Sequence, residues 1–429
     1  MDNKSIWESD VEIESFPFLN EDIKTNVLII GGGITGILCA YELKKRNINS
    51  VIVEKNKICK GITKNTTAFI TAQHEVLYQD LISKHGEKVA KEYLTLNLQA
   101  IKKFKELGEE FDIDFKECTS MIFTNESEDI ILKEKIALDS LGYYCSLSDS
   151  LPLDIPIKKG LTFKNQATIH PLKLIKNLVK DLTIYEETSI ERLYSNCAYT
   201  KNHKIKFNSV IIASHFPFVN TCGLYFMKMY QRRSYVVAFK DKKINGTFCS
   251  IDPDGLYFRN HGDYLIIGGN DRDTKNICKC SFENKIKNMF KNRNIEYSWS
   301  NQDCITLDKL PYIGRYSILH KNWYVATGFN LWGFTWAMAS SILLADYIEN
   351  KRKSSFLNPN RNMFNIQLVY NVLNTLKNMI TFRTPRCSHL KTALLYNKEE
   401  NTWECPSHGS RFNNEGNVLD GPAQKKIKR

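Results

Sequence analysis

Near its N-terminus, the chain passes from one pattern of hydrophobic and polar residues to another. Residues 27–30 form a short continuous apolar run, as expected of a parallel strand that is buried on both faces. A second strand is predicted over residues 50–53 and ends in Glu54. Between these segments, apolar residues recur near helical spacing, at Ile37, Leu38, Tyr41 and Leu43. The pattern therefore predicts a strand–helix–strand unit with a parallel sheet.

Further along the chain, similar patterns predict more strands and a connecting helix. Apolar runs at residues 210–214 and before Ala326 predict buried strands, the second followed by a helix from about Thr335. Residues 233–240 and 257–269 alternate between apolar and polar positions, which predicts the strands of a separate sheet. A helix that packs against the rest of the protein is predicted from Ile366, Val369, Val372, Leu373 and Leu376.

A glycine-rich turn joins the first predicted strand to the first helix. Gly31, Gly33 and Gly36 form the pattern G-x-G-x-x-G. The first glycine permits the tight bend, the second lets the backbone approach a pyrophosphate, and the third lets helix and strand pack closely. Glu54 is spaced to accept hydrogen bonds from a ribose. Because a strand, a helix and the acid accompany the glycines, one tightly held dinucleotide is favoured over a turn without a ligand.

Composition and charge narrow the class of protein. The 429 residues carry 59 Lys and Arg against 47 Asp and Glu, a formal net charge of +12. The lysines are mostly scattered, so we expect no nucleic-acid partner. Twelve cysteines are spread along the chain without a secretory signal, which predicts free thiols and a cytoplasmic location. Gly333 and Asp346 interrupt the longest weakly charged stretch, residues 328–348, so no membrane span is expected.

Two cysteines and two histidines lie close together near the C-terminus, as Cys387-x-His389 and Cys405-x-x-His408. Zinc is one alternative, but zinc fingers usually pair cysteine with cysteine and histidine with histidine. One cysteine and one histidine from each of two loops is the ligand set of a Rieske [2Fe–2S] centre, where the cysteines bind one iron and the histidines the other. We therefore predict that these four residues hold a [2Fe–2S] cluster.

Longer stretches resemble a known family. GGGITG (31–36), VIVEK (51–55) and GITKNTTAFITAQH (61–74) are similar to FAD-dependent oxidoreductases of the D-amino-acid oxidase (DAO) superfamily, in the branch with a C-terminal Rieske segment. The stretches that follow in the family's order are VIIASHFPF (210–218), GLYFRNHGDYLIIGG (255–269), LDKLPYIG (307–314) and VATGFNLWGFTWAMAS (325–340). CPSHGSRF (405–412) and GPA (421–423) resemble the second cluster loop and the cover loop of Rieske proteins. The resemblance implies FAD and a [2Fe–2S] cluster as cofactors.

The resemblance also implies an α/β fold, in which a Rossmann-like FAD-binding domain is interleaved with an α+β substrate domain and followed by a small all-β Rieske-type subdomain. The predicted parts are the FAD-binding domain (24–80, 155–220 and 320–351), the substrate domain (81–154 and 221–319), a helical connector (352–383) and the Rieske-type subdomain (384–429). Because a subdomain of this size buries little core, we expect it to dock on the flavin domain or on a partner.

Site residues follow from the same resemblance. Those expected to bind FAD are Gly31, Gly33, Ile34, Thr35, Gly36, Glu54, Lys55, Thr66, Thr67, Ala68, Ala213, Gly328, Trp332, Gly333 and Thr335. The catalytic candidates are Tyr257, Arg259 and His74. At strand spacing Tyr257 and Arg259 share a face, which is either the roof of the substrate site or the solvent side. His74 lies over the flavin, carries a covalent flavin link as in some relatives, or is structural.

The sequence departs from the family at two places. Many amino-acid oxidases have an Arg-Pro pair whose arginine binds a substrate carboxylate; here Asp303 and Cys304 take its place, which favours an amine. Many Rieske sequences have a further cysteine in each cluster loop, joined as a disulfide; here Thr392 and Ser407 take those places.

We therefore predict an FAD-dependent oxidoreductase that oxidises a C–N bond of a small amine or amino-acid derivative by hydride transfer to FAD. Electrons would then pass to the Rieske cluster and on to an unidentified external acceptor. One alternative is an electron-transfer or redox-sensing protein without a small-molecule substrate. Another is an oxidase whose tail holds structural zinc.

Overall fold

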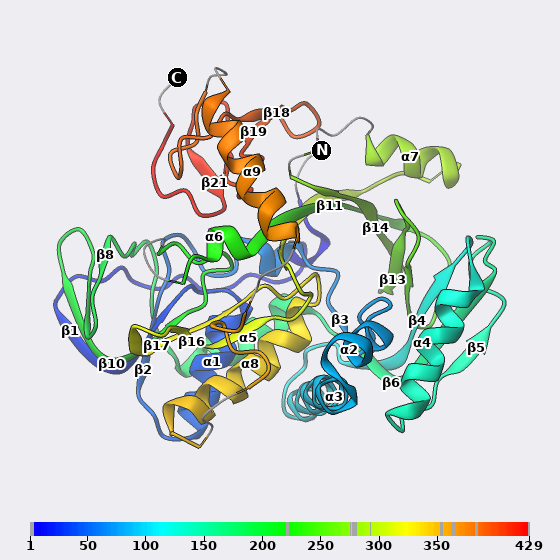
Figure 1. The fold of residues 1–429 in the computed structure, drawn as a ribbon, viewed down its shortest axis with the longest axis horizontal. Helices are drawn as coiled ribbons and strands as arrows, with labels where there is room; N and C mark the ends of the chain where they lie inside the picture. Colours follow the sequence, from blue (N-terminus) through cyan, green and yellow to red (C-terminus); the bar gives the residue numbers. More distant parts are fainter. Residues whose placement is uncertain are drawn as a thin grey trace.

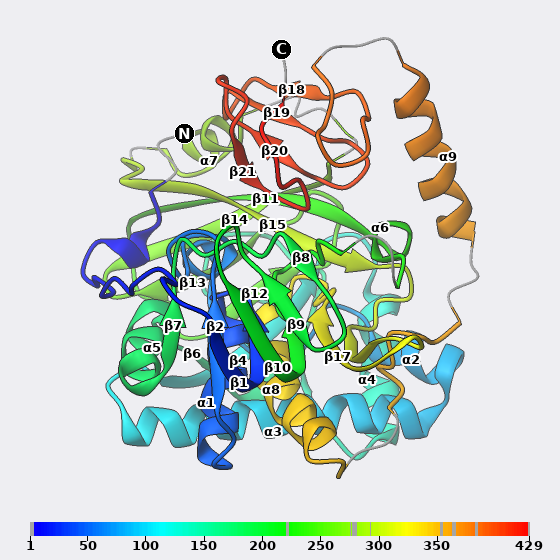
Figure 2. The same cartoon turned by 90° about the vertical axis from the view of Figure 1, so that its left-hand side faces the viewer.

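The computed structural model describes residues 4–219, 223–274, 276, 281–291, 293–351, 355–362, 366–381 and 385–427. Three β-sheets organise these residues (Figure 1). The first two are large and share the body of the molecule. The third is small and lies near the C-terminus, over the edge of the second (Figure 2).

The eight-stranded sheet is mainly parallel. Its strands are β16 (Tyr312–Ser317), β17 (His320–Thr327), β10 (Lys204–Ile212), β1 (Ile23–Ile30), β2 (Ser50–Val53) and β7 (Thr183–Tyr185) in spatial order. β9 (Cys197–Tyr199) also pairs with β10, and β8 (Arg192–Leu193) pairs with β9. β1 pairs in parallel with β2 and with β10. The helices packed with this sheet are α1 (Ile34–Lys45) and α8 (Gly333–Ile348), and α5 (Pro171–Leu178) packs on α1. The last four residues of β1 are buried, as the unbroken apolar run predicted.

The nine-stranded sheet is largely antiparallel. Its main path is β15 (Tyr297–Thr306), β11 (Met229–Lys240), β14 (Tyr264–Asp273), β13 (Tyr257–His261), β12 (Thr247–Ser250), β4 (Lys116–Thr124), β6 (Lys159–Thr168) and β3 (Phe69–Ile70), and β5 (Ser146–Ser148) pairs with β6. The accompanying helices are α2 (Tyr78–His85), α3 (Glu87–Glu110), α4 (Glu128–Ser140), α6 (Tyr225–Lys228) and α7 (Phe282–Met289). The short 3-10 helices are Ile6–Glu8, Ile62–Asn65 and Val179–Asp181.

The chain crosses between these two sheets several times, which gives the interleaved α/β architecture expected from the sequence. Three strands lie on the other side of the division from where the predicted boundaries put them. β3 (Phe69–Ile70) pairs with β6 in the nine-stranded sheet, although residues 24–80 were assigned to FAD binding. β6 (Lys159–Thr168) pairs with β4 in the nine-stranded sheet, although residues 155–220 were assigned to FAD binding. β16 (Tyr312–Ser317) forms a hairpin with β17 in the eight-stranded sheet, although residues 221–319 were assigned to the substrate domain. All three placements depend on hydrogen bonds between strands, which a hydrophobic pattern does not specify.

The four-stranded sheet contains β18 (Leu395–Asn397), β19 (Thr402–Glu404), β20 (Arg411–Phe412) and β21 (Val418–Asp420), paired in that order. We call residues 385–427 the Rieske subdomain. Its own core is small and consists of Cys387, Leu394, Cys405, Phe412, Ala423 and Ile427. So small a core cannot supply much stability, and the subdomain docks on the nine-stranded sheet (Figures 1 and 2). The contacting strands belong to the predicted substrate segment 221–319 rather than to the predicted FAD-binding segments.

A buried cluster of charges forms this docking contact. Arg233 of β11 is 1% exposed and donates to Glu400 from both Nε, at 2.5 Å, and Nη2. Arg411 also donates to Glu400, and Arg272 of β14 donates to Glu404 at 3.0 Å. Burial alone would raise the pKa of Glu400, but Arg233 and Arg411 outweigh burial and lower that pKa to about 2. The carboxylate therefore stays ionised and paired through its usual titration range and below it.

The connector is helical, but its predicted packing is wrong. α9 (Ile366–Ile380) leads toward the Rieske subdomain and lies at the edge of the molecule beside α6 (Figure 2). Val369, Leu373 and Leu376 are each about half exposed, so these apolar positions do not enter a core. The side chain of Ile366 lies outside the described residues. The 3.6-residue period predicted the helix, but it could not show whether another surface covers the apolar side.

Among the described residues, no helix combines the length and apolar character needed to cross a bilayer. None of the described cysteines forms a disulfide: Cys39, Cys59, Cys118, Cys145, Cys197, Cys249, Cys304, Cys387 and Cys405.

We expect Arg233→Met to destabilise the docked Rieske subdomain by about 3 kcal/mol, because it removes one partner of a buried carboxylate. Urea unfolding followed by the visible circular dichroism of the cluster would measure the loss. Arg293→Met is a matched control: Arg293 pairs with Asp241 at 2.9 Å, but its side chain is 47% exposed. The control should cost less than about 1 kcal/mol. Equal losses in the two variants would contradict the assigned docking role.

Candidate functional site

The glycine turn between β1 and α1 has no room for larger side chains. Gly31 has φ +117°, and a Cβ there would lie 2.6 Å from the carbonyl oxygen of Ala213. A Cβ on Gly36 would lie 2.0 Å from the carbonyl oxygen of Gly31. The first glycine thus lets β1 and the end of β10 approach each other, and the third lets α1 approach the turn.

A cavity opens above this turn, and we call it the cofactor cavity. It is lined by the turn itself, by residues that follow β2 and β10, and by the segment between β17 and α8. These segments lie at the carboxyl ends of parallel strands, where open α/β sheets bind their ligands. Glu54 lies at its wall, and its carboxylate accepts hydrogen bonds from Gly32 N at 2.8 Å and Asn56 N at 2.9 Å. The glycine cradle, the N-terminus of α1 and this acid fit a dinucleotide.

Most residues predicted to bind FAD lie around this cavity: Gly31, Gly33, Ile34, Thr35, Glu54, Lys55, Thr66, Ala213, Gly328 and Gly333. Thr67 and Trp332 line the neighbouring cavity instead. Gly36, Ala68 and Thr335 line neither cavity. Gly36 supports the turn from behind, and the side chain of Thr335 contacts His74 at 3.3 Å.

A second cavity of about 290 Å³ adjoins the first, with Thr66, Asn301, Asp303 and Gly333 among the residues that line both. We call it the acidic cavity. Five carboxylate residues line it, against one arginine, Arg232; the five are Glu75, Asp252, Asp254, Asp271 and Asp303. In a chain of net charge +12, this excess of negative charge is local. It makes the cavity a favourable environment for a cation.

Two of these carboxyl groups have strongly altered acidity. Burial and then the neighbouring Asp271 raise the pKa of Asp303 to about 7. Burial also raises the pKa of Asp271 to about 6, although Arg232 opposes this shift. Arg232 of β11 stands opposite Asp303 of β15 in the strand register, and its Nε lies 4.0 Å from Asp273 Oδ1. Near neutral pH, these groups can therefore bind a cation or exchange a proton.

The three catalytic candidates have different environments. Tyr257 lines the acidic cavity, and its ring lies against Gly268, whose Cβ would be 2.0 Å from the ring. Arg259 lines neither cavity, because its Nη1 donates to the carbonyl oxygens of Thr67 and Ala68 at 3.0 and 2.8 Å. Arg259 thus holds the loop at Ala68, which has φ +54°. The strand alternation of Tyr257 and Arg259 could not reveal this difference.

His74 is buried and lines neither cavity. Its Nε2 donates to the carbonyl oxygen of Thr71 at 2.9 Å, and its Nδ1 accepts from the hydroxyl of Tyr93 at 2.7 Å. Burial lowers the pKa of His74 to about 3, so the ring is neutral. With both nitrogens hydrogen-bonded, the contacts of His74 fit the structural alternative better than a covalent flavin link.

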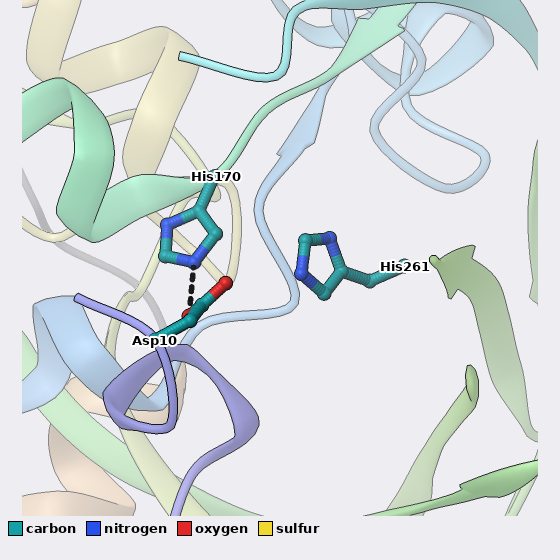
Figure 3. A group of neighbouring side chains, drawn as sticks. All are labelled: Asp10, His170 and His261. Carbon is teal, nitrogen blue, oxygen red and sulfur yellow. Dashed lines mark hydrogen bonds and ion pairs between the residues drawn. The ribbon is translucent and has the colours of Figure 1, made fainter. Parts of the chain in front are cut away.

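A separate cluster of Asp10, His170 and His261 lies where the N-terminal segment meets the substrate domain (Figure 3). Nδ1 of His170 accepts from Lys173 N at 3.1 Å, so the neutral ring carries its proton on Nε2, which faces Asp10 at 3.2 Å. A metal would need the lone pair of that nitrogen. Burial and then the Arg259 guanidinium also lower the pKa of His261 to about 4. The positive charge of Arg259 opposes a cation here, and the cluster is an intramolecular contact.

The predicted cluster ligands come together at one end of the Rieske subdomain. The thiols of Cys387 and Cys405 are buried, and the rings of His389 and His408 lie 5.1 Å apart. A hydrogen bond from Cys387 lowers the pKa of the Cys405 thiol. Nδ1 of His408 is buried without a hydrogen-bonding partner in the described part of the chain. Paired sulfurs and an unused buried nitrogen fit a metal cluster better than a thiol–imidazole core.

Residues 419–424, which we call the cover segment, separate the cluster loops from the cofactor cavity. On one side, Ala423 N donates to Ser410 Oγ at 3.1 Å, and a Cβ on Gly421 would lie 2.6 Å from Ser410 Cα. On the other side, Leu419, Asp420, Gly421 and Gln424 line the cofactor cavity. The two predicted cofactor sites are therefore neighbours.

Sequence reasoning missed several residues of these walls. His215 lines the cofactor cavity and Asp271 lines the acidic cavity. The position of His215 just after β10 was a usable signal, because strand ends face the ligand. No local pattern indicated the contribution of the cover segment, which results from docking.

Comparisons with known proteins agree with this arrangement. The family model for the FAD dependent oxidoreductase family (DAO) matches residues 26–347, and that for the Rieske [2Fe-2S] domain matches residues 356–429. The chain is 33% identical to a Bacillus subtilis protein named as Rieske 2Fe-2S iron-sulfur protein YhfW, over 99% of this chain and 97% of that protein. The two matched domains imply FAD and a [2Fe–2S] cluster as cofactors, and the zinc alternative is set aside.

Solved structures resemble the flavin portion of the chain. L-proline dehydrogenase from P. horikoshii matches with a TM-score of 0.66 and 19% identity, over 79% of this chain and 97% of that one. Glycine oxidase from Geobacillus kaustophilus matches with a TM-score of 0.67 and 18% identity, over 80% of this chain and all of that one. These likenesses establish the fold.

We expect Gly36→Ala to displace α1 from the turn, at a cost of about 1–3 kcal/mol, and to reduce FAD binding. The ratio of flavin to protein after purification, together with urea unfolding, would measure both effects. Ala40→Gly in the same helix is a control; it should cost about 1 kcal/mol and retain the flavin. A fully flavinated, stable Gly36→Ala protein would contradict the assigned role of the turn.

We expect Thr392→Val to lower the reduction potential of the cluster. Thr392 Oγ1 lies 3.1 Å from Cys405 Sγ, and towards a thiolate ligand the hydroxyl must be the donor. Such a bond stabilises the more negative, reduced cluster, so its loss should lower the potential by about 60 mV, a tenfold change for one electron. Redox titration followed by EPR would measure it. Ser407→Ala removes a hydroxyl without a partner among the described residues and should leave the potential unchanged.

Proposed function

This chain belongs to the DAO family of FAD-dependent oxidoreductases and carries a C-terminal Rieske [2Fe–2S] domain, and on that basis we propose a specific activity. The protein oxidises a C–N bond of a small amine or amino-acid derivative and delivers the electrons, through the Rieske cluster, to an external acceptor. One observation carries the proposal: the cofactor cavity has the acidic cavity on one side and the cover segment of the Rieske subdomain on the other.

The charges of the acidic cavity favour a cationic substrate. Asp303 is buried, and Oδ1 of Asp271 is buried and has no hydrogen-bonding partner in the described part of the chain. An ammonium group would supply donors to both carboxylates. Among the described residues of the lining, Arg232 alone is cationic, and it offers a place for a carboxylate if the substrate is an amino-acid derivative.

Asp303 is proposed as the group that removes the ammonium proton. An amine must be neutral before its C–H bond can give up a hydride, so a proton acceptor beside the flavin is useful. The pKa of Asp303, raised to about 7, is suited to accepting and releasing a proton near neutral pH. Bound FAD supplies the hydride acceptor, and the cluster supplies one-electron transfer at a potential raised by histidine ligation.

The docking geometry supports an electron route inside the chain. Gln231 of β11 donates to the carbonyl oxygen of His408 at 2.8 Å, and Gln302 of β15 donates to that of Gly409 at 2.7 Å. Gly409 has φ +69°, and a Cβ there would lie 2.7 Å from Gln231. These contacts fix the second cluster loop against the same strands whose other face lines the acidic cavity.

The structural neighbours named as L-proline dehydrogenase and glycine oxidase are named for amino-acid substrates, in agreement with C–N chemistry. The alternative is a redox sensor or electron carrier without a small substrate. The acidic cavity, with Tyr257 in its wall, favours a small substrate over this alternative.

Anaerobic mixing with a panel of small amines and amino acids tests the proposal. A substrate should bleach the flavin absorbance and then produce the EPR signal of a reduced Rieske cluster in the same sample. If no compound in the panel bleaches the flavin, but a protein reductant reduces both cofactors, the electron-carrier alternative gains support. Bleaching without a cluster signal would contradict the internal electron route.

We expect the affinity for a cationic amine to increase as the pH rises from about 5 to 8. Asp271 and Asp303, with pKa values raised to about 6 and 7, gain their negative charges over this interval while an alkyl amine stays protonated. Asp303→Asn should weaken binding about tenfold, or about 1.4 kcal/mol, and remove the step near pH 7. Flavin spectral perturbation by the amine would report the dissociation constant.

Asp263→Asn is the matched control for this prediction. Asp263 pairs with Lys243 on the exposed surface, and the substitution changes the net charge by the same amount. It should leave amine affinity and its pH dependence unchanged. Equal effects of the two substitutions would show that the overall charge of the protein, rather than the acidic cavity, attracts the substrate.

A further inference from the structure

The cover segment faces the cofactor cavity with side chains of three kinds. Leu419 is an apolar residue that is 46% exposed, and Gln424 is exposed with an amide that can donate and accept. Asp420 lies between them and accepts a hydrogen bond from Gly421 N at 2.7 Å. An apolar side chain, an amide and a carboxylate are suited to the rings, the hydroxyls and the N–H groups of a dinucleotide.

At another wall of the cofactor cavity, the flavin portion of the chain also lies close to the Rieske subdomain. His215, just after β10, lines the same cavity and has φ +62°. Phe216, the next residue, has its ring 6.4 Å from that of His408. One short segment of the flavin portion thus borders both the cavity and the second cluster loop. The cavity wall is complete only when the Rieske subdomain is docked.

We propose that the Rieske subdomain is a constituent of the FAD site, in which Leu419, Asp420 and Gln424 contact FAD, and that FAD binding and subdomain docking therefore strengthen each other. Thermodynamic linkage requires this coupling to be reciprocal: the factor by which docking increases FAD affinity equals the factor by which FAD favours docking. The inference goes beyond the proposed activity, since it holds for any substrate and any electron acceptor.

The test measures FAD affinity of the full-length protein by flavin fluorescence. Leu419→Ala and Gln424→Ala remove direct contacts. Arg233→Met weakens docking from the far face of β11 and lines neither cavity. Each variant should raise the FAD dissociation constant, by about 5- to 150-fold for a coupling of typical strength. Iron content should be unchanged in Gln424→Ala, which keeps the loss of FAD distinct from loss of the cluster.

Two controls accompany these variants. Lys425→Ala changes an exposed neighbour that lines neither cavity, and Arg293→Met removes a surface ion pair away from the docking contact. Both should bind FAD as the natural protein does. The reciprocal arm removes FAD and follows release of the Rieske subdomain by limited proteolysis, which should become faster.

The proposal is overturned if Leu419→Ala and Gln424→Ala bind FAD normally and removal of FAD leaves proteolytic release unchanged. That result would leave the amine activity untouched, because substrate-driven bleaching does not depend on it. Conversely, failure of every amine to bleach the flavin would not alter the measured coupling. If Arg233→Met does not fold, the two cover-segment variants decide the question alone.

Discussion

Alternation of side chains along three strands is the constraint on which the rest of this structure depends. On β11, Gln231, Arg233 and Tyr235 face the Rieske subdomain, whereas Arg232 and Ser234 line the acidic cavity. On β15, Ser300 and Gln302 face the subdomain, and Asn301 and Asp303 face the cavity. On β14, Asp271 and Arg272 divide in the same way. A single layer of backbone therefore separates the proposed substrate site from the cluster domain.

The same alternation keeps two opposite electrostatic environments apart. The outer face presents arginines to Glu400 and Glu404, and the inner face presents carboxylates to the cavity. A register shift of one residue would exchange these faces and leave buried charges unpaired on both sides. Buried ion pairs of this kind add less to stability than to geometry, because desolvation offsets much of their attraction. Their effect here is to fix where the cluster loops lie relative to the flavin.

The small Rieske subdomain is stabilised by its contacts with the nine-stranded sheet, because its own core is too small to stabilise it. Its buried apolar residues are few, and its second loop is held by Gln231 and Gln302 of the sheet beneath. The disulfide that braces many Rieske proteins is absent from the sequence, and Thr392 instead places its hydroxyl 3.1 Å from the sulfur of Cys405. Contacts with the larger domain, rather than a disulfide between the loops, hold the cluster loops in place.

The sequence by itself determined the features that depend on short spacings. The glycine turn, the strand–helix–strand unit and the two Cys/His loops follow from residues near one another in the chain, because local geometry limits what each can do. The family and both cofactors followed from the same motifs. Most of the residues that the sequence predicted to bind FAD line one cavity, the cofactor cavity.

Tertiary structure decided the rest. Arg259 shares a strand face with Tyr257 by spacing, yet backbone carbonyls of a distant loop bind it away from the cavity. The division of β6 and β16 between sheets, the exposure of α9 and the joining of Asp271, Asp303 and Arg232 all depend on partners far along the chain. The sequence pattern predicts which face of a helix or strand is apolar. Strand pairing and domain docking determine which other residues that face contacts.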